Sequence, residues 1–216
     1  MGCMDAAYGA DNRCLCPFCR TPATTSEGEY VKRIMKRVEA GDTSSINNLG
    51  SLYSLGAMGV PQDYEKAMEL WLQAGELGHA RAYHSVADSY YSGEGVEKDV
   101  KKAKYYYDLA AMGGEVASRQ KLGLFEAEAG NMNRAVKHWM IAAGAGDDVS
   151  LKCVRLFFSK GHATKDDFET ALRAHKDAKD ELKSDQRDAA AAKAAADELA
   201  NPEVFGTIRG RDTGTK

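Results

Sequence analysis

Apolar positions recur at three- and four-residue spacing along most of the chain, which is the period of helices with one buried face. The first apolar stripe, in residues 27–40, consists of Val31, Ile34, Met35 and Val38. Gly41 then interrupts the stripe, and the polar residues after it offer side-chain oxygens that can cap a following helix. The pattern predicts an N-terminal capping helix within residues 27–42, ahead of a longer helical array.

One stretch of this pattern occurs twice. Residues 49–78 return as residues 86–114, at an offset of 37 residues before a glycine-containing loop and 36 after it. The matched positions in the first copy are Tyr53, Gly56, Gly59, Val60, Asp63, Lys66, Ala67, Trp71, Ala74 and Gly78. A period of this length is typical of stacked helical repeats.

Each copy predicts a pair of helices. In the first copy, a helix over residues 43–55 buries Ile46, Leu49 and Tyr53, and a second helix, capped by Asp63, runs to about Leu77. The loop between them contains glycines and Pro61, which prevents the first helix from continuing. Small residues at positions 50, 87 and 123, and alanines at 67, 103 and 135, allow the paired backbones to approach closely.

Two further copies follow with decreasing fidelity. The third, over residues 115–147, has a shorter turn and carries Glu126 where the earlier copies have tyrosine. The fourth is degenerate, and its Ala171 and His175 stand where the third copy has Ala135 and Trp139. Such decay is expected of a terminal capping unit. After Leu182 the apolar stripe disappears, so residues 183–216 are expected to be an Ala-rich helical extension and a disordered tail.

The repeated pattern L-G-x-x-Y-x-x-G-x-G-V-x-x-D-x-x-K-A-x-x-W-x-x-x-A-x-x-x-G resembles the Sel1-like repeat, an α-helical relative of the tetratricopeptide repeat. The resemblance covers about residues 43–178. It implies an all-α fold: a right-handed α–α superhelix, or solenoid, of about four antiparallel helix pairs over residues 43–182. It also implies a non-catalytic scaffold or adaptor that binds a protein or peptide.

A second resemblance lies in the irregular segment 1–26. Residues 16–22, CPFCRTP, are similar to the closing knuckle of a RING-type zinc finger. That resemblance implies an alternative function, in which the repeats are the substrate-recognition part of a RING-type E3 ubiquitin ligase. The first half of the finger is absent, however, and neither of its two zinc sites would have the four ligands that structural zinc requires. If Met1 is the true start, this chain cannot build that fold.

The cysteines of this segment leave three interpretations open. They could bind one zinc ion as a four-thiolate site, belong to an unstructured remnant, or pair with a partner chain or an upstream segment. The candidate metal ligands are Cys3, Cys14, Cys16 and Cys19. No other cofactor is expected.

Composition and charge narrow the function further. The net charge is −3 and the pI about 6.0, without the clustered cations that nucleic acids or anionic membranes require. No run approaches the ~20 apolar residues of a membrane span, and the N-terminus does not resemble a secretory signal. We therefore expect an intracellular, cytoplasmic protein with a protein or peptide partner, no nucleic acid and no membrane span. The oligomeric state is not predicted.

No catalytic constellation is present in the sequence. The glycine-containing loops join two helices and are not followed by Lys-Ser/Thr, so they are not phosphate-binding loops. In helical solenoids the first helix of each pair lines a concave surface, and helix periodicity assigns nine residues to it as candidate partner contacts. These are Asn47, Ser51, Ser54, His84, Asp88, Tyr91, Gln120, Leu124 and Ala127.

Overall fold

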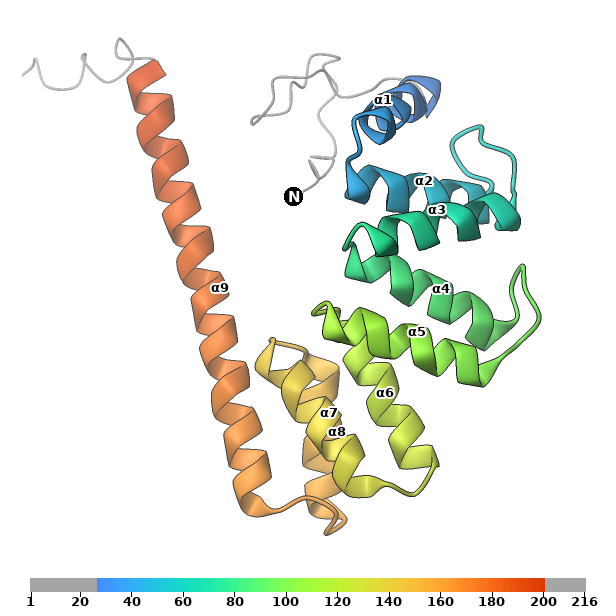
Figure 1. Ribbon diagram of the computed structural model, residues 1–216. Helices are drawn as coiled ribbons and strands as arrows, with labels where there is room; N and C mark the ends of the chain where they lie inside the picture. The colour runs from blue at the N-terminus through green and yellow to red at the C-terminus, as the bar shows by residue number, and fades with distance from the viewer. Residues whose placement is uncertain (1–26, 201–216) are drawn as a thin grey trace, which may run out of the picture. The chain divides into compact units, whose positions relative to one another are not determined.

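The computed structural model describes residues 27–200, which form nine helices and no strand (Figure 1). This confirms the all-α class and the succession of helix pairs that the repeat pattern predicts. The helices are α1 (Glu27–Glu39), α2 (Thr43–Leu55), α3 (Tyr64–Glu76), α4 (Ala80–Ser92), α5 (Val100–Met112), α6 (Val116–Glu128), α7 (Met132–Gly144), α8 (Asp148–Ser159) and α9 (Lys165–Ala200).

The chain divides into two compact units between Leu122 and Gly123, inside α6. The first unit holds α1 to α5 and the first half of α6. The second holds the rest of α6 with α7, α8 and α9. The sequence predicts one continuous solenoid over residues 43–182 and gives no sign of this division.

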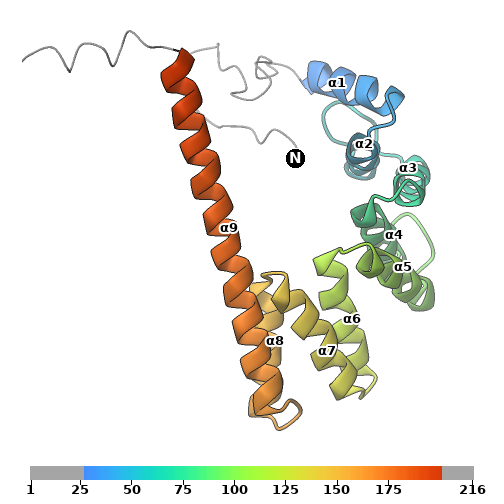
Figure 2. The same ribbon diagram turned by 60° about the vertical axis from the view of Figure 1, so that its left-hand side comes forward.

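Within the first unit, consecutive helices pack against one another in chain order from α1 to α5 (Figure 2). The loops that join α2 to α3 and α4 to α5 lie at the same edge of the stack (Figure 1). The core is built from the stripe positions, including Ile34, Ile46, Leu49, Trp71 and Val86. Met35, which the sequence places on the buried face of α1, is 42% exposed instead.

Capping residues fix where the repeat helices begin and end. Asp63 accepts a hydrogen bond from the Lys66 backbone N–H at 3.0 Å, and Asp99 does the same for the equivalent second helix. The first helices of both repeats end at a glycine in the left-handed region, with φ of 63° at Gly56 and 80° at Gly93. Because the same residues recur at these points, the two helix pairs fold alike.

Close contact between paired helices explains the small residues at one repeat position. A Cβ atom on Gly50 would lie 2.8 Å from the Trp71 ring, and one on Gly123 would lie 2.3 Å from the Trp139 ring. The Trp71 indole N–H also donates to the Asn47 carbonyl oxygen at 3.2 Å. Glycine on the first helix therefore makes room for the tryptophan of the second.

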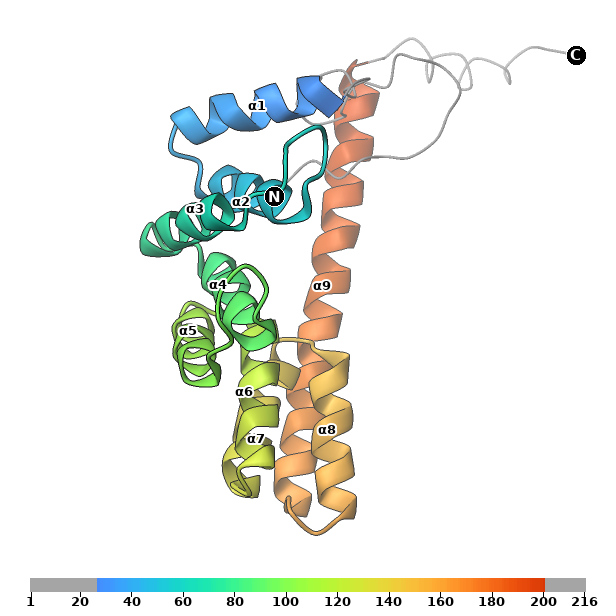
Figure 3. The same cartoon turned by 90° about the vertical axis from the view of Figure 1, so that its right-hand side faces the viewer.

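In the second unit, α7, α8 and the first turns of α9 pack around Ala135, Trp139, Ala143, Val154 and Ala171. Figure 3 shows α8 running beside the first part of α9. The latter is one helix of 36 residues, so the predicted last repeat helix and the Ala-rich extension are continuous. Within the described part of the chain, no helix is both long enough and apolar enough to cross a membrane.

Candidate functional site

A shallow groove opens between the first helices of the two well-preserved repeats. Its volume is about 160 Å³. We call it the α2/α4 groove, and its lining residues are Ser54, Leu55, Tyr64, Trp71, Ser85, Asp88, Ser89 and Glu94. It contains two of the nine residues that the sequence assigns to the partner-binding face, Ser54 and Asp88.

Hydrogen bonds across the repeat boundary hold one end of the groove. The Tyr64 hydroxyl, at the start of α3, donates to Glu94 Oε1 in the α4–α5 loop at 2.8 Å and accepts from the Gln62 side-chain amide at 2.9 Å. The Tyr64 side chain also packs closely on Gly95, where an added Cβ would lie 2.3 Å from the Tyr64 Cβ and 2.5 Å from the nearest ring atom. The turn of one repeat is thereby fixed to the loop of the next, and the positions of Tyr64 and Glu94 in the groove are set.

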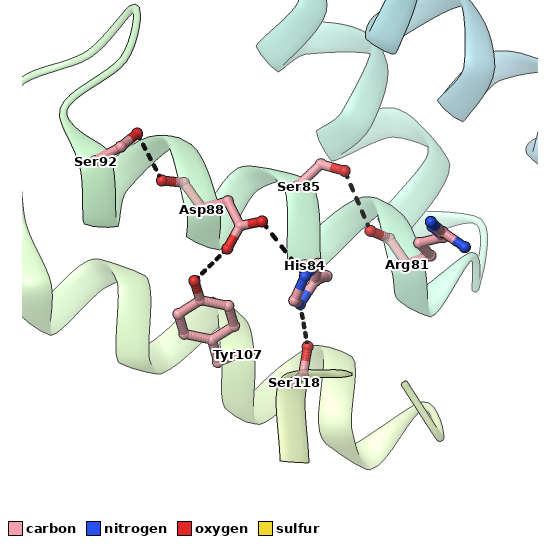
Figure 4. A network of polar contacts seen from close by, with 7 residues as sticks. All are labelled: Arg81, His84, Ser85, Asp88, Ser92, Tyr107 and Ser118. Carbon is pink, nitrogen blue, oxygen red and sulfur yellow. Dashed lines mark hydrogen bonds and ion pairs between the residues drawn. The ribbon is translucent and has the colours of Figure 1, made fainter. Parts of the chain in front are cut away.

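A partly buried polar network lies under the other wall of the groove (Figure 4). The ring of His84 on α4 contacts the Ser118 hydroxyl through Nδ1 at 2.8 Å and Asp88 Oδ2 through Nε2 at 3.4 Å. The Tyr107 hydroxyl donates to the other oxygen of Asp88. Asp88 and His84 are one helical turn apart, so a single face of α4 holds both α5 and the start of α6.

Burial determines the protonation of this network. Desolvation lowers the pKa of His84 below its usual value, although Asp88 opposes the shift. Burial and the hydrogen bond to Asp88 raise the pKa of Tyr107 well above its usual range. At neutral pH His84 is therefore an uncharged ring, and the tautomer with its proton on Nε2 can accept from Ser118 while it faces the carboxylate.

The order Ser118, His84, Asp88 superficially matches the hydrogen-bond order of a hydrolase triad. The exposure is the reverse of what catalysis requires, because Ser118 is completely buried whereas the Asp88 side chain is 50% exposed. A substrate carbonyl cannot reach a hydroxyl that has no accessible surface. We interpret the network as a structural clamp that positions α4 against its neighbours.

The other predicted contact residues have mixed environments. Asp88, Tyr91 and Leu124 are exposed, and Tyr91 lies between the ammonium groups of Lys98 and Lys121, each 5.5 Å from its ring centre. Half-buried side chains are those of Ser51, Ser54, His84, Gln120 and Ala127, of which Ala127 packs against the core of the second unit.

Asn47 departs from its predicted place. It is only 6% exposed and lies in the repeat core, where its side-chain oxygen has no hydrogen-bond partner among the described residues. A first helix is covered by its own partner and by the next repeat, so its buried arc is wider than the apolar stripe suggests. Asn47 therefore cannot contact a partner protein directly.

Sequence periodicity did not find most of the groove. Leu55 and Ser85 lie on first helices but one position away from the predicted strip, and Tyr64, Trp71 and Glu94 come from a second helix and a loop. The only sequence signal for Tyr64 is its place in the repeat, directly after the capping residue Asp63. Its contact with Glu94 spans 30 residues and exists only because the repeats stack.

The predicted metal ligands Cys3, Cys14, Cys16 and Cys19 lie outside the described residues. Among the side chains that the structure describes, no three of His, Cys, Asp or Glu gather in a way that could hold a metal ion. The remaining cysteine, Cys153, is a free and half-buried thiol, and burial raises its pKa. It is therefore poorly suited to act as a nucleophile.

Comparison with known proteins supports the repeat assignment. The Sel1 repeat family matches residues 43–79 and 80–115, which are the two helix pairs that line the α2/α4 groove. No curated protein matches the sequence significantly.

Two solved structures are similar to this chain. A Sel1 repeat protein from Oxalobacter formigenes is 29% identical, with a TM-score of 0.61, and the match covers 70% of this chain and 64% of that one. The protective antigen c5321 of uropathogenic Escherichia coli, which displays the same repeat fold, is 25% identical with a TM-score of 0.59. That match covers 70% of this chain but only 33% of the antigen. This chain thus spans less than two thirds of either protein. Residues 43–115 match the Sel1 repeat twice, within an all-α fold of helix pairs like that of solved Sel1 repeat proteins.

Proposed function

We propose that this protein is a non-catalytic interaction scaffold that binds a segment of a partner protein in the α2/α4 groove. Sel1 repeats are generally protein-interaction scaffolds, and the groove lies between the two repeats that the family matches. The observation that carries the proposal is the groove itself: an open surface between first helices that is lined by serine side chains, the carboxylates Asp88 and Glu94, and apolar atoms of Leu55 and Tyr64.

The charges of the groove favour a particular kind of segment. Its charged lining residues, among those described, are the carboxylates Asp88 and Glu94. The nearby cations Lys98 and Lys121 lie over Tyr91 and do not line the groove. A partner segment with a lysine or arginine beside a small apolar residue would therefore complement this surface.

The RING-type alternative rests only on the similarity of residues 16–22, which lie outside the described residues. It therefore remains a hypothesis from the sequence.

The experiment should block the groove without breaking the clamp beneath it. Substituting His84 or Asp88 would disturb the contacts to Ser118 and Tyr107, so a loss of binding could reflect unfolding. Ser54→Arg with Ser85→Arg instead fills the groove from two half-buried positions on helices, where arginine is a good helix former. Gln73→Arg, on the exposed face of α3, is the control for an added arginine outside the groove.

The probe is a set of peptides selected from a random displayed library on the wild-type protein. We expect lysine or arginine to be enriched in them, and we expect the double variant to bind them about tenfold or more weakly, equivalent to about 1.4 kcal/mol. Gln73→Arg should bind them as the wild type does. If the double variant keeps its affinity while remaining folded, the partner site lies elsewhere.

A further inference from the structure

A second, larger groove lies in the other unit, on the last helix pair. Its volume is about 500 Å³, and we call it the α8/α9 groove. Its lining residues are Asp148, Leu151, Lys152 and Arg155 of α8, with Phe168 and Leu172 of α9. It is not part of the α2/α4 groove, and the proposed function does not use it.

Aligning the repeats shows whether the equivalent surface of the preceding helix pair is covered or exposed. Ala171 and Ala135 are equivalent buried positions, with 1% and 0% exposure, so Leu172 takes the place of Val136. Val136 is 3% exposed, because another helix pair follows it and packs against α7. Leu172 is 46% exposed. The same apolar position is thus covered in one pair and open in the next.

Comparison of α8 with α4, the first helices of their pairs, also shows that a surface covered in an earlier repeat is open in the last one. Val154 on α8 and Val86 on α4 are equivalent and fully buried, so Lys152 occupies the position of His84. His84 faces the following first helix and bonds to its Ser118 at 2.8 Å. Lys152 has no such helix in front of it among the described residues. The α8/α9 groove is therefore the face on which each earlier pair seats the first helix of the next repeat.

The lining chemistry selects the kind of helix that would fit. Leu151, Phe168 and Leu172 supply an apolar floor, and Phe168 is fixed by stacking on Phe158 with ring centres 5.3 Å apart. Asp148 is already engaged by His175 at 2.9 Å and Lys179 at 3.2 Å.

Two cations at the groove remain uncompensated. Lys152 and Arg155 are both exposed, and neither has an ion-pair partner in the part of the chain that the structure describes. An uncompensated pair of cations beside an apolar floor complements an acidic amphipathic helix.

We propose that the α8/α9 groove seats a helix of a partner protein that presents apolar residues at helical spacing with glutamate or aspartate beside them. The partner helix takes the place of the first helix of a following repeat. Its apolar stripe covers Leu172 and Phe168, and its carboxylates pair with Lys152 and Arg155.

The test uses a defined probe: a fluorescent amphipathic peptide of about 18 residues, long enough to form a helix, with a leucine stripe flanked by glutamates. A second peptide carries lysines in place of the glutamates. Binding is measured by fluorescence anisotropy against the wild type and the charge-reversed variant Lys152→Glu/Arg155→Glu. The control is Arg173→Glu/Lys176→Glu, which makes the same change in net charge at exposed positions of α9 that do not line the groove.

We expect the wild type and the control variant to bind the glutamate peptide, and the charge-reversed variant to bind it about tenfold or more weakly. The lysine peptide should bind the wild type weakly and the charge-reversed variant better. Blocking the α2/α4 groove with Ser54→Arg/Ser85→Arg should leave this binding unchanged, which separates it from the proposed function.

Three outcomes would overturn the proposal. The wild type could fail to bind the glutamate peptide, or both charge reversals could affect it equally. Sedimentation analysis could also show that the chain self-associates through Lys152 and Arg155, in which case a second copy occupies the groove. Thermal melts of each variant confirm that the compared proteins are folded.

Discussion

The Trp71 indole lies against the backbone of Gly50, so closely that a Cβ atom at this glycine would be 2.8 Å from two ring atoms. The contact joins the two helices of the first repeat, and the third pair repeats it with Gly123 and Trp139. The glycine position is thus a packing requirement for the fold.

Gly50→Ala should therefore destabilise the protein although alanine is the better helix former. The added methyl group must displace a large buried ring, and we expect a loss of about 1–3 kcal/mol in the free energy of unfolding, measured by urea denaturation. Gly144→Ala is the control, because its Cβ would meet only Ala174 at an ordinary 3.6 Å. That variant should be neutral or slightly more stable. Equal behaviour of the two variants would contradict the close-packing account.

The unpartnered oxygen of Asn47 allows a stabilising change. His84 bonds to Ser118 of the following first helix, and the residue equivalent to Ser118 opposite Asn47 is Ala82. Buried serines already occupy the equivalent position in other repeats, at Ser45 and Ser118, so this position of the repeat can accept a hydroxyl.

Ala82→Ser should give Asn47 Oδ1 a donor and stabilise the protein by about 0.5–1.5 kcal/mol. A double-mutant cycle with Asn47→Ala measures the coupling between the two residues. Without Asn47 the new hydroxyl has lost its acceptor, and the gain should vanish. A gain that persists in the Asn47→Ala background would show that the serine bonds elsewhere.

The clamp at His84 should make stability depend on pH. Burial lowers the pKa of His84 in the folded protein, so the unfolded chain binds more protons as the pH falls through the ordinary histidine value of about 6.5. The contribution of the neutral His84 ring to the free energy of unfolding is therefore fully present above that pH and is lost as the pH falls below it. Burial also lowers the pKa of His79, which contributes with the same sign.

His84→Gln should reduce the drop in melting temperature between pH 7.5 and pH 5.5, without abolishing it because His79 remains. The control is His162→Gln, at an exposed position, which should leave the profile as it is in the wild type. An unchanged pH profile in His84→Gln would mean that the buried ring is not the proton-linked group.

Glu126 is a carboxylate at 2% exposure in the position where the first two repeats have tyrosine. The Asn131 side-chain amide donates to it at 2.9 Å, and Arg134 approaches it at 3.8 Å. The shorter turn of the third repeat brings Asn131 and Arg134 within reach of Glu126. The glutamate at this position therefore depends on the shorter turn for its hydrogen-bond partner.

Asn131→Ala removes one hydrogen-bond donor from the buried Glu126 side chain and should cost about 1–3 kcal/mol in thermal or urea unfolding. Asn133→Ala, at an exposed position of α7, should have little effect. If both variants are equally stable, the carboxylate does not depend on Asn131.

Sequence reasoning predicted the elements better than the site. The helix over residues 43–55 and the cap at Asp63 were confirmed because they depend on local spacing and capping chemistry. The burial of Asn47 and the bond from Tyr64 to Glu94 depend on how one repeat lies on the next. Helical periodicity shows which face of a helix is apolar, but it does not show how much of the polar face a neighbouring repeat covers.

The division of the chain inside α6 could not be predicted for a similar reason. Residues around Leu122 and Gly123 keep the helical pattern and the small residue that pairs with tryptophan, so the local signal is continuous. Where a helical array separates into compact units depends on long-range packing.

The most direct test of the scaffold account is the affinity of library-selected peptides for the wild type, Ser54→Arg/Ser85→Arg and Gln73→Arg, measured by calorimetry at two salt concentrations. The double variant should lose about tenfold or more in affinity, and Gln73→Arg should lose none. Binding should also be weaker at high salt, since carboxylates line the groove. Peptides that bind all three proteins equally would contradict the claim that the α2/α4 groove is the partner site.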